Sequence, residues 1–275
     1  MTCHDRRDLT LACLESLRDQ SFFQPRDLYL VDDGSTDGTG DAVRAAMPGA
    51  QVIAGDGSLF WNGGMRKAWT AAKRDETDYD FYLWLNDDVL LAPDALAMLV
   101  ADADATVPRG RAVIVSGACH EPGNPNEITY GAQRRPDKKR QFRLELVEPG
   151  GTPREAVSVS GNVVLVSRAA ERRLGNLTPK LTHIYGDLDY GFRAVDAGVP
   201  VVLASRVAGS CPANPDTGTS QEADLSRATR LKRLRRERAA LHGRDWNTFV
   251  AMHGNLFERI GHRVAPYIRA LRAQR

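Results

Sequence analysis

Residues 28–39 read LYLVDDGSTDGT, and this stretch decides the fold class of the chain. The apolar run at 28–31 ends in turn residues, which is typical of a buried strand in a parallel sheet. Residues 35–39 then offer side chains that can cap a helix over about 39–47. A strand that leads through a polar turn into a helix is the repeating unit of doubly wound α/β proteins, in which ligands bind beyond the carboxyl ends of the strands.

The same unit recurs along the first half of the chain. Residues 51–54 predict another strand, and a helix is expected over 64–73. The run FYLWL at 81–85 is the strongest strand pattern, and it stops at Asn86-Asp87-Asp88. Another helix is expected from Pro93 onward, with proline in its first turn. Acidic pairs therefore follow two of the predicted strands, where an α/β sheet binds its ligands.

The beginning of the chain leaves little room for a first strand. Residues 8–18 have the leucine spacing of an amphipathic helix, and only residues 1–5 precede them. Either the first strand is very short, or the reading frame begins a few residues inside the natural domain.

The second half predicts a mixed region rather than a continuation of the parallel repeat. Short strands are expected at 112–116, 127–130, 141–147, 157–166 and 199–204, with a helix over 187–197. Residues 210–219 form a polar loop rich in proline and glycine, which is expected to be mobile and to close over a ligand. From about residue 222 the chain is predicted to be helical and basic.

Composition excludes several classes of protein. Of 275 residues, 42% are hydrophobic and 26% charged, which excludes collagen-like, coiled-coil and wholly disordered chains. No run reaches the about 18 apolar residues of a membrane span, and the first residues lack the apolar core of a signal peptide. Four scattered cysteines fit reduced thiols, so a cytoplasmic location is expected. The net charge of +2 does not indicate a nucleic-acid partner.

Four short motifs together resemble family-2 glycosyltransferases of the GT-A fold. Residues 30–39 resemble the nucleotide-binding signature of that family, and Asn86-Asp87-Asp88 resembles its D-x-D motif with asparagine in the first place. Residues 186–193, GDLDYGFR, resemble E-D-x-D-L-x-x-R, and residues 2–6, TCHDR, resemble T-x-x-N-R. Their order and spacing match over residues 1–205.

The resemblance implies an α/β fold with a mostly parallel sheet flanked by helices and a helical C-terminal extension. It places the catalytic domain at residues 1–220, with a nucleotide-binding half over 1–105 and an acceptor half over 106–220. The basic extension then covers 221–275. The implied activity is transfer of a sugar, with inversion, from a UDP-, dTDP- or GDP-linked donor to a hydroxyl of a sugar or lipid-linked acceptor, in polysaccharide or glycolipid assembly.

The resemblance also implies a donor site with a divalent cation. Asp33 would accept hydrogen bonds from the base or ribose, Asp87 would lie near the ribose, and Asp88 would bind Mn²⁺ or Mg²⁺. Carboxylate oxygens suit a hard cation that also contacts phosphate oxygens and water. The other donor-binding candidates are Thr2, His4, Arg6, Asp56, Gly64, Arg66, Lys67 and Asn86.

The glycine-rich segment at 55–67 supports two interpretations. Helix N-termini favour anions, so Arg66 or Lys67 could reach a phosphate. Alternatively, Gly63 and Gly64 allow a helix to pack tightly on the sheet, and the two charges are solvated. Trp61 could stack on a ring or fill the core.

The catalytic base is assigned by the last motif. Asp187 aligns with the aspartate that deprotonates the acceptor hydroxyl, although Gly186 replaces the preceding glutamate of the family pattern. Asp189 is expected to orient the site or cap the helix, and to pair with Arg193 one turn later. The alternative for both carboxylates is a purely structural role at a helix N-terminus.

Two features of the C-terminal part have alternative interpretations. Family members carry a histidine after the last sheet strand, but here that stretch contains Cys211. The candidate metal ligand in its place is His253, and His183 could face the site instead. A lone histidine also serves purely structural roles. The basic run at 227–238 could contact the inner face of an anionic membrane, or could be a solvated helix that packs its leucines inward.

Two other classes of function stay open on the sequence. A sugar-phosphate nucleotidylyltransferase shares a related sheet, but it needs a glycine-rich basic loop after the first strand, and residues 2–8 contain no glycine. A non-catalytic sugar-nucleotide-binding protein would keep Asp33 and Asp88 and could dispense with Asp187.

Overall fold

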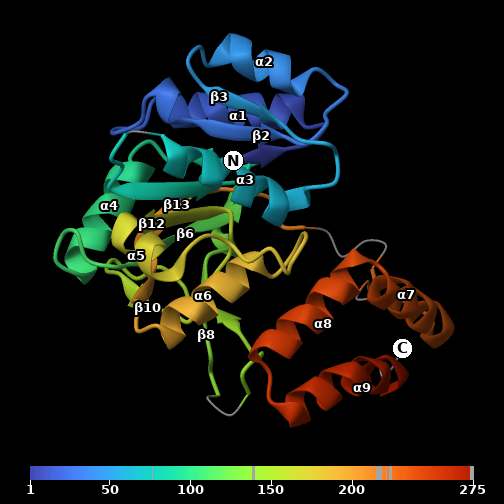
Figure 1. Cartoon of the computed structure of the whole chain (residues 1–275). Coiled ribbons are helices and arrows are strands. Elements are labelled where there is room, and N and C mark those ends of the chain that lie inside the picture. The colour runs from blue at the N-terminus through green and yellow to red at the C-terminus, as the bar shows by residue number, and fades with distance from the viewer. Residues whose placement is uncertain (76, 138–139, 215–218, 221, 223–224, 273–275) are drawn as a thin grey trace.

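A computed structural model describes residues 1–75, 77–137, 140–214, 219–220, 222 and 225–272. It confirms the α/β class: a sheet region is flanked by helices, and a group of three helices ends the chain (Figure 1). The elements of the first half are β1 (Thr2–Cys3), α1 (Arg7–Arg18), β2 (Tyr29–Asp32), α2 (Thr39–Ala46), β3 (Gln51–Ala54), α3 (Phe60–Arg74), β4 (Phe81–Leu85), β5 (Leu90–Leu91) and α4 (Ala95–Thr106). The short first strand that the sequence allowed is therefore two residues long.

The three strands β1, β2 and β3 form a parallel sheet in the order β1-β2-β3. Helices cover both faces of this sheet. Successive side chains of β2 point to opposite faces, so both faces carry apolar groups that the helices bury. Leu30 packs in one apolar cluster with Leu14 of α1 and Val43 of α2, whereas Val31 packs on the other face against Ala68 of α3. This is the doubly wound arrangement that the repeated strand–turn–helix pattern predicts.

The second half of the chain contributes most of a mixed sheet in the order β10-β13-β6-β12-β4. Among the described residues of this sheet, only β13 and β6 pair in parallel. The elements are β6 (Ile114–Glu121), β7 (Asn124–Tyr130), β8 (Ala132–Arg134), β9 (Glu145–Leu146), β10 (Arg154–Glu155), β11 (Ser158–Val159), β12 (Val163–Ser167), α5 (Arg168–Leu174), α6 (Gly186–Asp196) and β13 (Val201–Ser210).

Several predicted boundaries shift. The strand expected at 157–166 divides into β11 and β12, because Gly161 lies between them directly against the ring of Trp61. The strand expected at 141–147 shrinks to β9. By contrast, β13 runs six residues beyond the expected 204, with register shifts along its pairing to β6.

The C-terminal helices are α7 (Arg227–Ala239), α8 (Leu241–His253) and α9 (Leu256–Arg272). They pack on one another, and α8 lies nearest to the rest of the molecule (Figure 1). Phe249 of α8 is buried in an apolar cluster with Leu181 and with Phe192 of α6. Among the described residues, no helix is both long enough and apolar enough to cross a bilayer.

Candidate functional site

Two cavities compete as the functional site. The first, the polar cleft, measures about 520 Å³ and lies at the carboxyl ends of β1, β2 and β4. Of the fourteen site residues predicted from the sequence, eight line it: Thr2, His4, Arg6, Asp33, Asn86, Asp87, Asp88 and Asp187. The fold therefore gathers residues from both ends of the predicted α/β domain into one cleft.

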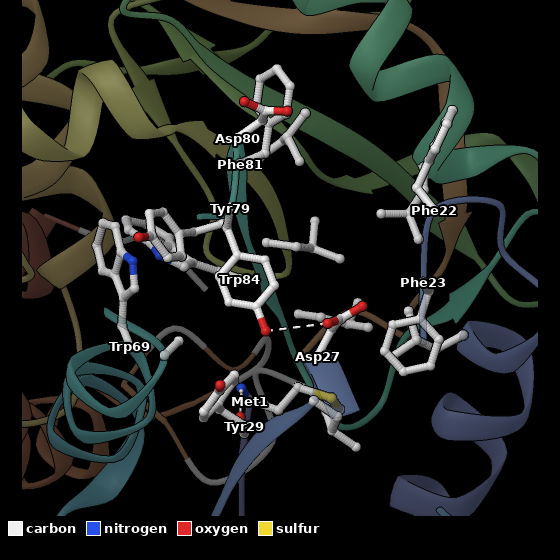
Figure 2. A pocket seen from close by; sticks show the side chains of 18 of the residues that line it. Met1, Phe22, Phe23, Asp27, Tyr29, Trp69, Tyr79, Asp80, Phe81 and Trp84 are labelled. Atoms are coloured by element: carbon white, nitrogen blue, oxygen red, sulfur yellow. Dashed lines mark hydrogen bonds between the residues drawn. The ribbon is translucent and has the colours of Figure 1, made fainter. Parts of the chain in front are cut away.

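The second cavity, the apolar pocket, measures about 320 Å³ and runs along β4 toward the start of β2. Figure 2 shows its walls, in which Trp69 and Phe23 lie on either side of a hydrogen bond of 3.2 Å from the Tyr79 hydroxyl to the Asp27 carboxylate. Its two carboxylates, Asp27 and Asp80, belong to different parts of the wall (Figure 2), and its lining includes none of the predicted site residues. The polar cleft is therefore the candidate site.

Asp33 organises one wall of the polar cleft. Its carboxylate is buried and accepts three backbone hydrogen bonds of 2.9 Å, from the N–H groups of Gly57, Leu59 and Phe60. These bonds fix the loop after β3 and the first turn of α3. The Asp33 carbonyl also accepts a bond of 2.7 Å from His4 Nδ1. Much of the hydrogen-bonding capacity of this carboxylate is thus used inside the protein, leaving part of Oδ1 for a ligand.

Four other predicted donor-binding residues do not line the polar cleft. Gly64 faces Thr2 so closely that a Cβ atom would overlap the Thr2 side chain, which matches the packing alternative for this glycine. Lys67 donates instead to the Ala54 carbonyl at 2.7 Å. The exposed Asp56 accepts hydrogen bonds from the N–H and the hydroxyl of Ser58. Arg66 lies one helical turn or more past the start of α3, and its Nε is buried without a hydrogen-bond partner.

Arg6 joins the two carboxylates at the end of β4. Its Nη1 lies 2.8 Å from Asp88 Oδ2 and 3.3 Å from Asp87 Oδ1. Burial raises the pKa of Asp87 to about 6, with a smaller contribution from the neighbouring Asp88 carboxylate, while Arg6 opposes the shift. Asn86 has a different task, because its Oδ1 accepts a bond of 2.7 Å from the indole N–H of Trp61.

The carboxylates of Asp87 and Asp88 fit a divalent cation. They supply hard oxygen ligands on the wall of an open cleft, with 9% and 18% of their side chains exposed. Among the described residues no three His, Cys, Asp or Glu side chains gather into a complete metal site. A cation here would need ligands from a bound diphosphate and from water, which is the usual mode of Mg²⁺ binding beside phosphates.

Asp187 lies across the polar cleft, in the first turn of α6. Its Oδ2 accepts a bond of 2.8 Å from the N–H of Gly161, and its Oδ1 accepts one of 2.8 Å from the N–H of Leu188. Burial raises the pKa of this carboxyl, while the two backbone donors act in the opposite direction. A half-buried carboxylate that is fixed by backbone groups and faces a cleft can accept a proton from a bound hydroxyl.

Asp189 has a different environment, although it shares that helical turn. It is fully buried, and its Oδ2 accepts a bond of 2.8 Å from Arg193 Nε, which confirms the predicted pair. Its Oδ1 lies 2.9 Å from Nε2 of His253 on α8. Neither Asp189 nor His253 lines the polar cleft. The structure therefore joins the candidate metal ligand His253 to Asp189, not to Asp88.

The residue at the position of the missing histidine is part of the cleft region. Cys211 is buried, and its Sγ lies 3.5 Å from Asp88 Oδ1 and 3.4 Å from Asn162 Nδ2. Burial raises the pKa of this thiol above its usual range, so the thiol form is favoured. Within the loop expected to act as a lid, residues 215–218 lie outside the described residues, and Asn214 lines the cleft.

Sequence reasoning missed one residue that shapes the cleft. Asp245 of α8 is buried, and its carboxylate accepts bonds from the N–H groups of Thr182, His183 and Ile184. It thereby fixes the segment that brings His183 to the cleft wall and leads into α6. No local signal marks this role, because the partners lie more than sixty residues apart in the sequence.

Comparisons with known proteins identify the family and the fold of the chain. The family model described as Glycosyl transferase family 2 matches residues 1–157. The chain is similar to a solved mannosyltransferase, PcManGT from Pyrobaculum calidifontis in complex with GDP-Man and Mn²⁺, at 16% identity and a TM-score of 0.53, covering 100% of this chain and 74% of that one. It is also similar to S. aureus TarS 1–349 in complex with UDP, at 13% identity and a TM-score of 0.50, covering 98% and 79%. No curated protein matches the chain.

Proposed function

The chain belongs to glycosyltransferase family 2 and has the GT-A fold, and on that premise we propose that it transfers a sugar from a nucleotide-sugar donor in the polar cleft to a hydroxyl acceptor, with inversion. One observation carries the proposal. A half-buried carboxylate fixed by two backbone N–H groups, Asp187, faces the same cleft as the carboxylate pair Asp87 and Asp88. Such a cleft can hold a base and a leaving diphosphate together.

In the proposed reaction Asp187 acts as the general base. The acceptor oxygen forms a bond to the anomeric carbon while the bond from that carbon to the diphosphate oxygen breaks, and the hydroxyl proton passes to Asp187. The nucleoside diphosphate leaves with the electron pair. The raised pKa of Asp187 suits this role, because a carboxylate of higher pKa binds the proton more strongly.

The other side of the cleft would receive the leaving group. Asp88, with Asp87 beside it, would hold Mn²⁺ or Mg²⁺, and such a cation supplies positive charge to the departing diphosphate. Arg6 keeps the two carboxylates together through Nη1 and brings a fixed positive charge to the same wall. Trp61, held by Asn86, gives the cleft a flat apolar surface beside them.

The finer assignments belong to the proposal as well. The donor would be linked to UDP, dTDP or GDP, which is consistent with GDP-Man and UDP in the two similar structures. The acceptor would be a sugar or a lipid-linked sugar in polysaccharide or glycolipid assembly, on the cytoplasmic side of a membrane. Residues 1–220 would form the catalytic unit, and the helices of 221–275 would support it, since Asp245 and His253 contact segments near the cleft.

A thermal-shift screen of nucleoside diphosphates with and without Mn²⁺ tests the donor site. A ligand at 100 times its dissociation constant stabilises the folded chain by about 2.7 kcal/mol, which is readily measured. We expect one nucleoside diphosphate to stabilise the chain only when Mn²⁺ is present, and Asp88→Ala to abolish that effect. Asp94→Ala is the matched control, because Asp94 is exposed and pairs with Arg206. Stabilisation of Asp88→Ala equal to that of the wild type would contradict the assignment.

A further inference from the structure

Exposed apolar side chains are concentrated on the outer face of α9. Eleven large hydrophobic residues are exposed in the described part of the chain, and five of them lie on this one helix. They are Leu256, Phe257, Ile260, Val264 and Ile268, with exposed fractions of 68%, 85%, 57%, 49% and 42%. At 100° per residue these positions fall within about 120° of the helix circumference. We refer to these five side chains as the α9 face.

The opposite side of α9 contacts residues 141–142, and Tyr267, which falls within the arc of the α9 face, lies against the Arg238 guanidinium of α7 at 5.8 Å. Glu258 accepts a hydrogen bond from the N–H of Gln141, and the His262 ring packs edge-on against Phe142 at 5.0 Å between ring centres. The His262 carbonyl also accepts a bond from Arg238 of α7. These contacts fix the rotation of α9 and leave the five side chains of the α9 face exposed. In Figure 1 the helix lies at the periphery, on the far side of α8 from the sheet.

Charge is divided unequally along the chain. Residues 227–275 carry thirteen basic and three acidic residues, a net charge of +10, whereas residues 1–226 carry 24 basic and 32 acidic residues, a net charge of −8. On α7, which packs against α9, the side chains of Arg227, Lys232, Arg235 and Arg236 are exposed. The apolar face thus belongs to a strongly cationic unit attached to an acidic one.

We propose that the α9 face and the exposed cations of α7 form a docking surface for an anionic phospholipid bilayer. Helices that lie in the bilayer interface combine Phe, Leu and Ile on one side with a basic polar surface, and they bind through apolar burial together with attraction to anionic lipids. The +10 unit is complementary to such a surface. A second copy of the chain that docked by the same face is less suitable, because it would bring two units of charge +10 together.

The surface is connected to the polar cleft by a short path. Only Gly254 and Asn255 separate α9 from α8, and Asp245 of α8 holds the segment that places His183 on the cleft wall. The inference deepens the proposed function and rests on it in one respect: a lipid-linked acceptor would give this enzyme reason to reside at a membrane. Docking itself depends on no catalytic residue.

Vesicle co-sedimentation of the full chain tests the surface. The wild type should bind phosphatidylcholine vesicles that contain phosphatidylglycerol, bind pure phosphatidylcholine weakly, and lose binding as salt is raised. Phe257→Ser combined with Ile260→Ser should weaken binding to the anionic vesicles at least about tenfold. Arg235→Gln combined with Arg236→Gln should weaken it by a smaller factor and reduce the salt dependence. Leu9→Ser, which removes an exposed leucine from α1, should leave binding unchanged.

Two further measurements keep the inference separate from the proposed function. Each variant is also tested for stabilisation by nucleoside diphosphate and Mn²⁺, which shows that it folds and keeps the donor site. Vesicle binding without any nucleotide binding would remove the proposed function and leave the docking surface standing. Equal vesicle binding by the Phe257/Ile260 variant would overturn the docking surface. So would a concentration-dependent dimer, in sedimentation equilibrium, that this variant abolishes, because the occupant would then be a second copy.

Discussion

The polar cleft and the apolar pocket differ in chemistry although the same strands build both. Strand β4 lines the apolar pocket along its length, and the residues directly after it, Asn86 to Asp88, line the polar cleft. The difference arises from position along the strand. Side chains within a strand pack between layers, whereas the turn after it is free to carry charged groups to the edge of the sheet. Cavity shape alone would not have distinguished the two.

Burial acts on charged groups in both regions, with different results. In the polar cleft it raises the pKa values of Asp87 and Asp187, which favours proton uptake by carboxylates that face a ligand. Beside the apolar pocket it lowers the pKa of the Met1 amine to about 6, while that amine donates to the Tyr29 carbonyl at 2.9 Å. Perturbed groups that face an open polar cleft indicate function, whereas those packed between layers indicate structure.

The largest effect is expected for Asp187→Asn. This change keeps the shape of the side chain and removes its ability to take a proton, so sugar transfer should slow at least about 100-fold while nucleotide binding stays unchanged. Initial rates with the donor found in the thermal-shift screen measure the effect. Asp196→Asn at the exposed end of α6 is the matched control. Normal transfer by Asp187→Asn would remove the base from the mechanism.

The second prediction concerns the pH dependence of the cleft. The pKa of Asp87 is raised by burial to about 6, above its ordinary value of 3.8, so the folded state takes up this proton before the unfolded state does. The stabilisation that results is complete below about pH 4 and is lost as the pH rises through about 6. Asp87→Asn lacks this ionisation and should gain up to about 3 kcal/mol relative to the wild type between pH 4 and 8.

Denaturant unfolding at several pH values measures this gain, with Asp196→Asn as the exposed control. The same Asp87→Asn chain should bind nucleoside diphosphate and Mn²⁺ more weakly at pH 8, because a carboxylate ligand is lost. If the difference in stability between Asp87→Asn and the wild type did not change with pH, the pKa of Asp87 would not be raised in the folded state. Burial of its charge would then cost no stability.

Strands β2, β3 and β4 could be predicted from the sequence, because each is a local apolar run followed by a turn with acidic residues, whereas the two-residue β5 was not predicted. The residues after β2 and β4 line one cleft for the same reason, whereas Asp187, which lines it too, is predicted only from the resemblance of residues 186–193 to a family motif. Arg66 and Lys67 were misplaced because α3 begins at Phe60, four residues before the expected Gly64. The carboxylate of Asp33, which is distant in the sequence, accepts hydrogen bonds from the N–H groups of Leu59 and Phe60. With this cap the helix begins about one turn earlier than expected.

The second-half contacts could not be predicted in the same way. His253 and Asp189 are 64 residues apart, and Asp245 lies about as far from the segment it holds. Both contacts depend on how α8 docks beside α6, which is decided by aromatic packing around Phe249 rather than by a motif. Because His253 belongs to no motif, the sequence alone could not distinguish a metal-binding role from a contact with a carboxylate.

The third prediction separates Asp189 from Asp187. Asp189→Asn breaks a buried network that joins Arg193 and His253, so the free energy of unfolding should fall by about 3–5 kcal/mol. Once folded, the variant should transfer sugar within a few-fold of the wild type, because Asp189 does not reach the polar cleft. Rates measured below the unfolding transition test this. A folded Asp189→Asn chain without activity would show that the two carboxylates have exchanged roles.

The smallest effect is expected in the apolar pocket. Tyr79→Phe removes the hydroxyl that donates to Asp27 while keeping the ring in the pocket wall, so stability should fall by about 0.5–1.5 kcal/mol. Transfer rate and nucleotide affinity should not change, because no residue of this wall reaches the polar cleft. Asp27→Asn provides a second test of the same bond, since its amide oxygen can still accept. A loss of transfer in Tyr79→Phe without loss of stability would mean that the two cavities are coupled, and that the division between a structural and a functional end of the sheet does not hold.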